Sequence, residues 1–180
     1  MDIKETGFKE CFIIEPKIFR DKRGYFFESF NLETFNKKTG LNISFVQDNE
    51  SLSQIGTLRG FHYQIGEYAQ AKLVRVIKGK VLDVAVDIRK SSPTYGKHFS
   101  IILSEENQKQ LFIPRGFAHG FLVLENNTIF SYKCDNYYNK ESERGIIYND
   151  KTLKIDWNFP KEQLILSEKD INLPTFKDIK

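Results

Sequence analysis

The sequence predicts an all-β protein whose strands pair antiparallel, as a sandwich, a jelly roll or a barrel. Ten short segments rich in β-branched and aromatic residues fill most of the chain, and turn-forming residues separate them. Almost no helical pattern lies between these segments, which argues against the crossover helices of a parallel sheet. A closed barrel can enclose one small ligand, so polar residues on its inward faces are the candidates for function.

The expected elements follow one another along the chain. The expected strands are 11–14, 25–30, 43–48, 58–63, 72–77, 80–88, 97–103, 110–113, 120–124 and 128–133. Gly, Pro, Ser and Asn mark turns at 78–79, 91–96, 114–116 and 126–127. A helix is expected at about 32–38, because Asn31 can cap its start and Gly40 its end. A short helical turn is expected to begin at Ser167, since Ser167 to Asp170 resembles a capping box.

Composition indicates one cytoplasmic globular domain. The chain has 180 residues, which is enough to bury a core, and its net charge of +3 comes from interspersed signs. That charge pattern leaves no basic surface for nucleic acid, and no apolar stretch is long enough to span a membrane. The first residues have no apolar leader segment. Cys11 and Cys134 form neither a disulfide framework nor a metal-binding spacing.

The three histidines limit the chemistry of the barrel interior. No His-x-His pair is present, so no metal site is expected. His62 is the candidate for acid–base work because its unperturbed pKa lies near neutrality, the alternative being a strand histidine satisfied by its neighbours. A regular strand would place Arg59 and His62 on opposite faces. Gly60 between them predicts a local irregularity that aims both side chains inward.

Four further residue patterns each allow a functional and a structural interpretation. Lys72 lies on an otherwise apolar strand face, where it needs an anionic partner or ligand unless it reaches water at the strand end. Tyr132 is either a core tyrosine or, in a pocket, a proton donor. Tyr138 offers a flat ring to a nucleobase or packs against the protein. Arg23 and its neighbour Arg20 suit a phosphate, or form a solvated turn.

Taken together, ordered motifs identify a family resemblance. They are Phe45-Val-Gln-Asp-Asn49, Leu58-Arg-Gly-Phe-His-Tyr-Gln64, Lys72-Leu-Val-Arg75, Asp83-Val-Ala-Val-Asp-Ile-Arg89, Ser92-Pro-Thr-Tyr-Gly96 and Ile113-Pro-Arg-Gly-Phe-Ala-His-Gly-Phe121. The chain closely resembles the dTDP-4-dehydrorhamnose 3,5-epimerases from about Glu15 to Asp170. The resemblance implies an antiparallel, cupin-type jelly-roll barrel with a few short helices. It also implies a single domain over 1–180, with a core at about 40–135 and extensions at both ends.

The resemblance further implies an activity and its residues. The activity is cofactor-free inversion of C3 and C5 in dTDP-4-keto-6-deoxyglucose by a homodimer. His62 resembles the base with Asp170 as its carboxylate partner, Tyr132 the acid on the opposite face, and Lys72 the residue near the C4 oxygen. The positions that resemble substrate contacts are Phe19, Arg23, Glu28, Gln47, Asn49, Arg59, His119, Tyr138, Glu143 and Lys169.

Two further expectations concern the nucleotide and the partner subunit, and three alternative functions stay open. Phe19 and Tyr138 resemble the residues that flank the thymine ring, and Arg23 and Glu28 are expected to serve the partner subunit's site. A mono-epimerase that inverts C3 or C5 alone, on a related nucleotide-linked 4-keto sugar, would share these residues. A non-catalytic sugar-binding barrel and a metal-dependent oxygenase are the remaining alternatives.

Overall fold

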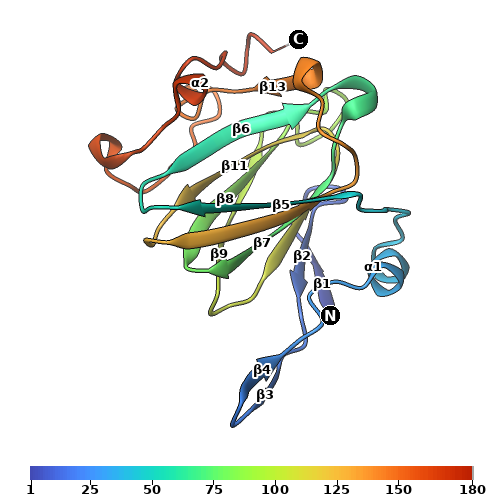
Figure 1. Ribbon diagram of the computed structural model, residues 1–180. Coiled ribbons are helices and arrows are strands. Elements are labelled where there is room, and N and C mark those ends of the chain that lie inside the picture. Colours follow the sequence, from blue (N-terminus) through green and yellow to red (C-terminus); the bar gives the residue numbers. More distant parts are fainter. Residues whose placement is uncertain (180) are drawn as a thin grey trace.

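The computed structural model describes residues 1–179, and it consists of two facing antiparallel sheets that enclose the core (Figure 1). One sheet has six strands in the order β1-β2-β10-β7-β12-β5, and the other has five in the order β13-β6-β11-β8-β9. This architecture confirms the expected jelly-roll class. The expected domain over 1–180 includes residue 180, which lies outside the described residues.

The elements have the following bounds. The six-stranded sheet contains β1 (Asp2–Glu5), β2 (Phe12–Glu15), β10 (Gln110–Ile113), β7 (Lys72–Lys78), β12 (Thr128–Cys134) and β5 (Gln47–Ser53). The five-stranded sheet contains β13 (Glu143–Gly145), β6 (Leu58–Gln64), β11 (Phe117–Val123), β8 (Lys80–Asp87) and β9 (His98–Ser104). A separate hairpin joins β3 (Phe19–Asp21) to β4 (Gly24–Phe26). The helices are α1 (Leu32–Thr39) and α2 (Glu168–Ile171), with 3-10 turns at Gly66–Tyr68, Lys140–Ser142 and Lys161–Gln163.

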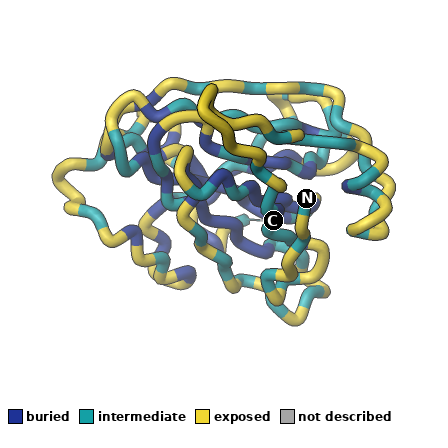
Figure 2. Tube along the Cα trace, turned by 90° about the horizontal axis from the view of Figure 1, so that it is seen from below, coloured by how far each residue is buried: buried dark blue, intermediate teal, exposed yellow. Residues whose placement is uncertain are grey.

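Apolar side chains pack in three places around these sheets. The first two clusters lie on opposite faces of β8. Val81 and Ala85 face the barrel interior, whereas Val84 and Val86 face the C-terminal segment that covers the five-stranded sheet. The third cluster lies where α1, through the fully buried Phe35, covers one end of the six-stranded sheet. Buried residues therefore run through the centre of the molecule, and exposed residues concentrate at its edges (Figure 2).

The strand expected at 43–48 is wrong, because the observed strand β5 begins at Gln47. Along β5 the half-buried positions include Gln47, Asn49 and Ser51, so the face turned to the protein is polar. A strand that lines a polar cavity has no alternation of apolar residues for sequence analysis to detect. Residues 43 and 45 are apolar because they pack, without strand structure, in the cluster around Phe35.

The expected strand 25–30 is also wrong in extent, since β4 ends at Phe26. The short strands β1, β3 and β13 were not expected, and the other expected strands agree with the structure to within a few residues. Both expected helices are confirmed with their caps. Asn31 accepts a hydrogen bond from the Thr34 N–H at 2.9 Å, and Ser167 accepts one from the Asp170 N–H at 3.1 Å.

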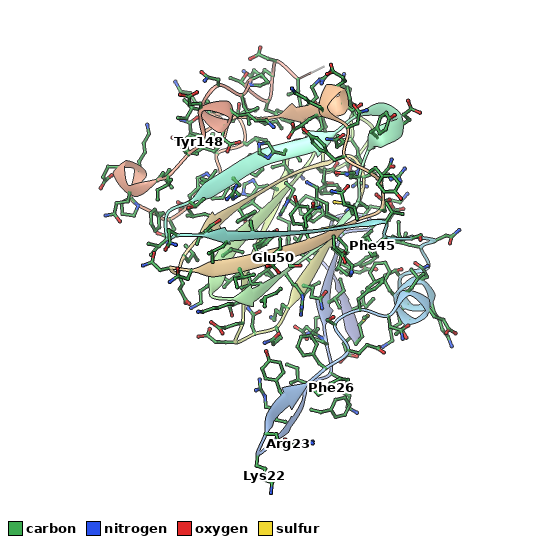
Figure 3. All side chains as sticks on the ribbon, viewed as in Figure 1. Lys22, Arg23, Phe26, Phe45, Glu50 and Tyr148 are labelled. Atoms are coloured by element: carbon green, nitrogen blue, oxygen red, sulfur yellow. The ribbon has the colours of Figure 1, made fainter. Side chains whose placement is uncertain are left out.

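The hairpin formed by β3 and β4, hereafter the arm, projects away from both sheets (Figure 1). Phe26 at its side is 70% exposed, and Arg23 near its tip points into solvent (Figure 3). Large exposed aromatic residues are unusual on an isolated protein surface and mark contact sites. None of the helices within residues 1–179 is long and apolar enough to cross a membrane.

Candidate active site

The candidate active site lies between the two sheets. Two adjoining cavities, of about 280 Å³ and about 420 Å³, share the side chains of Asn49, His62, Lys72 and Tyr132. These residues come from β5, β6, β7 and β12, so both sheets contribute to the shared wall. Volumes of this size are comparable with small-molecule sites.

His62 forms a hydrogen-bonded pair with Asp170 of α2. Their Nε2 and Oδ1 atoms are 2.6 Å apart, and the Ser167 hydroxyl donates to Asp170 Oδ2 at 2.8 Å. Burial alone would raise the pKa of Asp170, but the hydrogen bonds from His62 and Ser167 hold it below its usual value. An ionised carboxylate only accepts hydrogen bonds, so Nε2 of His62 carries the proton and Nδ1 is left as the basic nitrogen.

Tyr132 faces this pair from the opposite sheet. Burial raises the pKa of its phenol, so the hydroxyl keeps its proton at neutral pH. Lys72 lies next to it, with Nζ 5.8 Å from the centre of the tyrosine ring. Burial lowers the pKa of the Lys72 amine, and nearby groups including Asp83 and Glu143 oppose that effect.

The predicted irregularity at Gly60 is confirmed. His62 pairs with His119 and Arg59 pairs with Phe121, so the step of three residues on β6 is matched by two on β11. This bulge places Arg59 and His62 on the same side of the strand, and both line the larger cavity. Gly60 is required there, since its φ is +118° and an added Cβ would lie 2.6 Å from Gly120 Cα.

A hydrogen-bonded chain forms the outer wall of the smaller cavity. Gln47 donates to Asn49 at 2.9 Å and accepts from the Tyr138 N–H at 3.1 Å. The Tyr138 hydroxyl donates to Glu143 at 2.9 Å, and Glu143 forms an ion pair with Lys169. The Tyr138 ring is half exposed beside the cavity, where it offers a face for stacking.

The larger cavity contains the remaining residues of the set that the structure brings together. Arg59 donates to Ser53 at 3.2 Å, and buried His119 lies 2.9 Å from Asp83 through Nε2. Lys169 lines this cavity with them. Eleven of the fourteen residues proposed from the sequence thus line the two cavities, Asp170 among them in the larger one.

Phe19, Arg23 and Glu28 are not brought to the cavities of their own chain. Arg23 forms a two-pronged contact with Asp21 inside the arm, and Glu28 accepts a hydrogen bond from Asn31 at 3.2 Å. The expected pairing of Phe19 with Tyr138 around a ring is therefore absent within one chain, as far as residues 1–179 show.

Sequence analysis missed the supporting roles of Ser167 and Asp83. Ser167 was expected only as a helix cap, yet its hydroxyl also bonds the Asp170 carboxylate. Asp83 lies behind His119, and a carboxylate on the apolar inward face of β8 was the signal that could have identified it. Among residues 1–179, no group of three or more His, Cys, Asp or Glu side chains could hold a metal ion.

The arrangement suits the removal of a proton from carbon and its return from the other side. An imidazole oriented by a carboxylate can take the proton, and a neutral phenol on the facing sheet can supply one. The Lys72 amine beside the phenol can, when protonated, stabilise the oxyanion that forms when the carbon lies beside a ketone. Fold and site together define a jelly-roll epimerase that acts next to a carbonyl group.

Comparison with known proteins identifies the family. The family described as dTDP-4-dehydrorhamnose 3,5-epimerase matches residues 5–178. A protein of that name from Shigella flexneri is 52% identical over 178 residues, which are 99% of this chain and 97% of the relative. The chain belongs to the dTDP-4-dehydrorhamnose 3,5-epimerase family.

Two solved structures show the range of this similarity. A dTDP-6-deoxy-D-glucose-3,5-epimerase from Legionella pneumophila, in complex with dTDP-4-keto-L-rhamnose, is 49% identical with a TM-score of 0.95, covering 99% of this chain and 94% of its own. A 3'-monoepimerase from Streptomyces bikiniensis, in complex with dTDP-quinovose, is 31% identical with a TM-score of 0.87, covering 94% and 85%. The same fold therefore occurs with single and with double inversion.

Proposed function

We propose that this protein inverts C3 and C5 of dTDP-4-keto-6-deoxyglucose and releases dTDP-4-keto-L-rhamnose. The observation that carries the proposal is that the His62–Asp170 pair and Tyr132 face one cavity from opposite sheets, with Lys72 next to Tyr132 on the neighbouring strand. Both carbons neighbour the C4 ketone, so one set of residues can act on each in turn. The 52% identity to a 3,5-epimerase favours double over single inversion.

Each inversion begins with His62, which removes the proton from carbon and passes no charge to Asp170, since that carboxylate only orients and stabilises the imidazolium. Electrons from the C–H bond move onto the C4 oxygen, where the Lys72 ammonium stabilises the enolate. Tyr132 then delivers a proton to the opposite face of the carbon. The phenolate regains a proton from water, and the His62 imidazolium releases its proton to water before the second cycle.

Binding of the nucleotide supplies orientation away from the reacting carbons. Tyr138 supports the thymine ring on one side, and Arg59, His119 and Lys169 provide hydrogen bonds and positive charge for the sugar diphosphate. Gln47, Asn49 and Glu143 supply further polar contacts.

The proposal includes a homodimer in which the arm completes the partner subunit's site. An arm that leaves more than half of the side-chain surface of Phe19, Tyr25 and Phe26 exposed supports this, with Phe19 at 54% and Phe26 at 70%. The partner's Arg23 would then exchange its contact with Asp21 for the diphosphate, and the partner's Glu28 would reach the same site. Location in the cytoplasm is supported by two cysteines that are buried and unpaired.

Proton NMR in D₂O tests the reaction. Purified protein mixed with dTDP-4-keto-6-deoxyglucose is expected to introduce deuterium at C3 and C5 and to give an L-configured product that a downstream reductase traps. Exchange at one carbon would establish the mono-epimerase. An absence of exchange, with the sugar still bound, would indicate a binding protein.

Removal of metal ions tests the proposal that the reaction needs no cofactor. Dialysis against EDTA is expected to leave the rate of exchange unchanged, because Arg59, Lys72 and Lys169 supply the positive charge in the larger cavity. A rate that falls on dialysis and returns with added Fe²⁺ or Zn²⁺ would contradict the proposal.

A further inference from the structure

One carboxylate oxygen of Asp83 lies inside the barrel without a hydrogen-bond partner among the described residues. The residue is fully buried, and its Oδ1 is the one buried side-chain polar atom among residues 1–179 that has no hydrogen-bond partner. Its other oxygen, Oδ2, lies 2.9 Å from His119 Nε2. A buried carboxylate with half of its acceptors unused is costly, so it requires a compensating role.

Asp87 shows what a structural carboxylate looks like on the same strand. It is equally buried, four residues further along β8, and accepts hydrogen bonds from Arg89, Ser92 and Thr94 on both of its oxygens. The chain can therefore satisfy an inward aspartate completely where it serves only the fold. At Asp83 it does not, although Asp83 is just as completely buried.

The groups next to Asp83 belong to the candidate active site. His119 lies between Asp83 and the larger cavity, which it lines together with Lys72. No carboxylate among residues 1–179 lies within 4.0 Å of the Lys72 amine, so the amine has no direct ion pair. Asp83 and Glu143 are the carboxylates whose charge counteracts the effect of burial on the pKa of Lys72.

We propose that Asp83 is a positioning residue of the reaction: one oxygen fixes the His119 ring at the cavity wall, and the carboxylate behind that ring favours positive charge on the Lys72 amine, which lines the same cavity. The inference rests on the proposed function, because a charged amine matters only if an oxyanion develops at the C4 oxygen. The unpaired Oδ1 follows from this role. A direct ion pair would hold Lys72 against the barrel wall, whereas a charge at a distance leaves its hydrogens free for the substrate.

Other groups also face Lys72 and must be separated from Asp83 in a test. They are Tyr132 and Cys134 on β12, Glu143 on β13, and, in the same cavities, Asn49, Arg59, His62 and His119. Burial raises the pKa of Cys134 to about 11, so its thiol is neutral at pH 7. Asp83 is absent from the charges that act on the Tyr132 phenol, so a change at Asp83 is expected to affect the lysine selectively.

The test compares Asp83→Asn with Asp87→Asn. Lysine Nζ signals are followed by ¹⁵N NMR against pH, with the Lys72 signal assigned from Lys72→Arg, and kcat/KM for exchange at C3 and C5 is measured over the same range. Loss of the Asp83 charge is expected to lower the midpoint of the Lys72 titration, and with it the alkaline limb of kcat/KM, by about one pH unit. Asp87→Asn is expected to shift neither.

Several results would overturn the inference. They are an unchanged Lys72 titration in Asp83→Asn, an equal shift in Asp87→Asn, or a Lys72 that is already neutral at pH 7 in the unmodified protein. The last measurement does not use Asp83→Asn, so it can overturn the inference even where that variant does not fold. If the unmodified protein exchanges neither carbon, the proposed function fails, and the Lys72 titration still reports on Asp83 independently.

Discussion

At the scale of single residues, the proposal gives His62 and Tyr132 different steps. His62 removes the carbon proton and Tyr132 delivers a proton to the opposite face, and an assay of product alone does not distinguish the two. His62 is tied to Asp170 on one sheet, and Tyr132 keeps its proton on the other because burial raises its pKa. In the proposed reaction the base acts in exchange of the carbon proton, whereas the acid acts only in delivery from the opposite face. The two substitutions should therefore have different signatures.

We expect His62→Asn to reduce deuterium exchange by about 10²–10⁴-fold, and Tyr132→Phe to reduce formation of the inverted product by about the same factor. Tyr132→Phe should retain exchange, since His62 still removes a proton and returns a deuteron on the same face. NMR in D₂O measures both quantities in one sample. Equal loss of exchange and inversion in Tyr132→Phe would contradict the separation of roles.

Acid stability should depend on Asp87. Burial raises the pKa of this carboxyl, but the hydrogen bonds from Arg89, Ser92 and Thr94 outweigh it and lower the pKa from 3.8 to about 2. The folded pKa is below the unfolded one, so the contribution is present above about pH 4 and is lost as the pH falls through about 2.

Asp87→Asn is accordingly expected to lose about 2 kcal/mol of unfolding free energy at pH 7, with the difference from the unmodified protein disappearing between about pH 4 and pH 2. Urea unfolding at a series of pH values measures it. A difference that stays constant down to pH 2 would exclude this origin.

At the scale of elements, the bulge in β6 determines which side chains reach the cavity. Gly60 packs against Gly120 of β11, and a methyl group there would meet the backbone at 2.6 Å. Rigid backbone on both sides cannot move away without a shift of the strands that carry His62 and His119.

We expect Gly60→Ala to destabilise the fold by about 2–4 kcal/mol through overpacking and the positive φ. Gly66→Ala is the control for a positive φ in open space, because its φ is +63° with no atom within 4 Å of the added Cβ, and it should cost about 1 kcal/mol. Thermal and urea unfolding measure both variants. Similar losses would show that φ alone, and not the contact with β11, requires glycine.

How far sequence analysis succeeded also differs between elements. Strands β8 and β11 face packed apolar layers, so their residue types define them. Strand β5 was misplaced because the cavity beside it requires Gln47, Asn49 and Ser51 in place of apolar residues. The bulge at Gly60 was predictable, because only an irregular strand could aim both Arg59 and His62 inward.

The residues behind the cavity were harder to foresee. A serine at a helix start indicates a cap, and nothing in the sequence states that its hydroxyl also reaches Asp170. The pairing of His62 with Asp170 spans 108 positions, so residue patterns alone could not supply it, and the family resemblance did.

At the scale of the whole molecule, a single chain has the cavities but lacks contacts from Phe19, Arg23 and Glu28. If the arm serves the partner subunit, two inactive variants should restore each other. His62→Asn retains its arm, and Arg23→Ala retains its base. A mixed dimer of the two therefore contains one complete site.

After subunit exchange in equal amounts, about half of the dimers are mixed, so about a quarter of the original activity should return. Each variant mixed with itself is the control. Absence of recovery, with mixed dimers present by native mass spectrometry, would show that each arm serves its own chain.

The position of Asp170 near the end of the chain also determines how late in synthesis the His62–Asp170 pair can form. Every strand of the barrel wall except β13 is synthesised by residue 134, and the base at His62 emerges long before its carboxylate. A ribosome-bound chain can thus assemble most of both sheets while the imidazole is still unoriented. If Asp170 has the proposed role, activity requires residues 167–170 to dock against β6, so translation must pass this segment before any sugar is turned over.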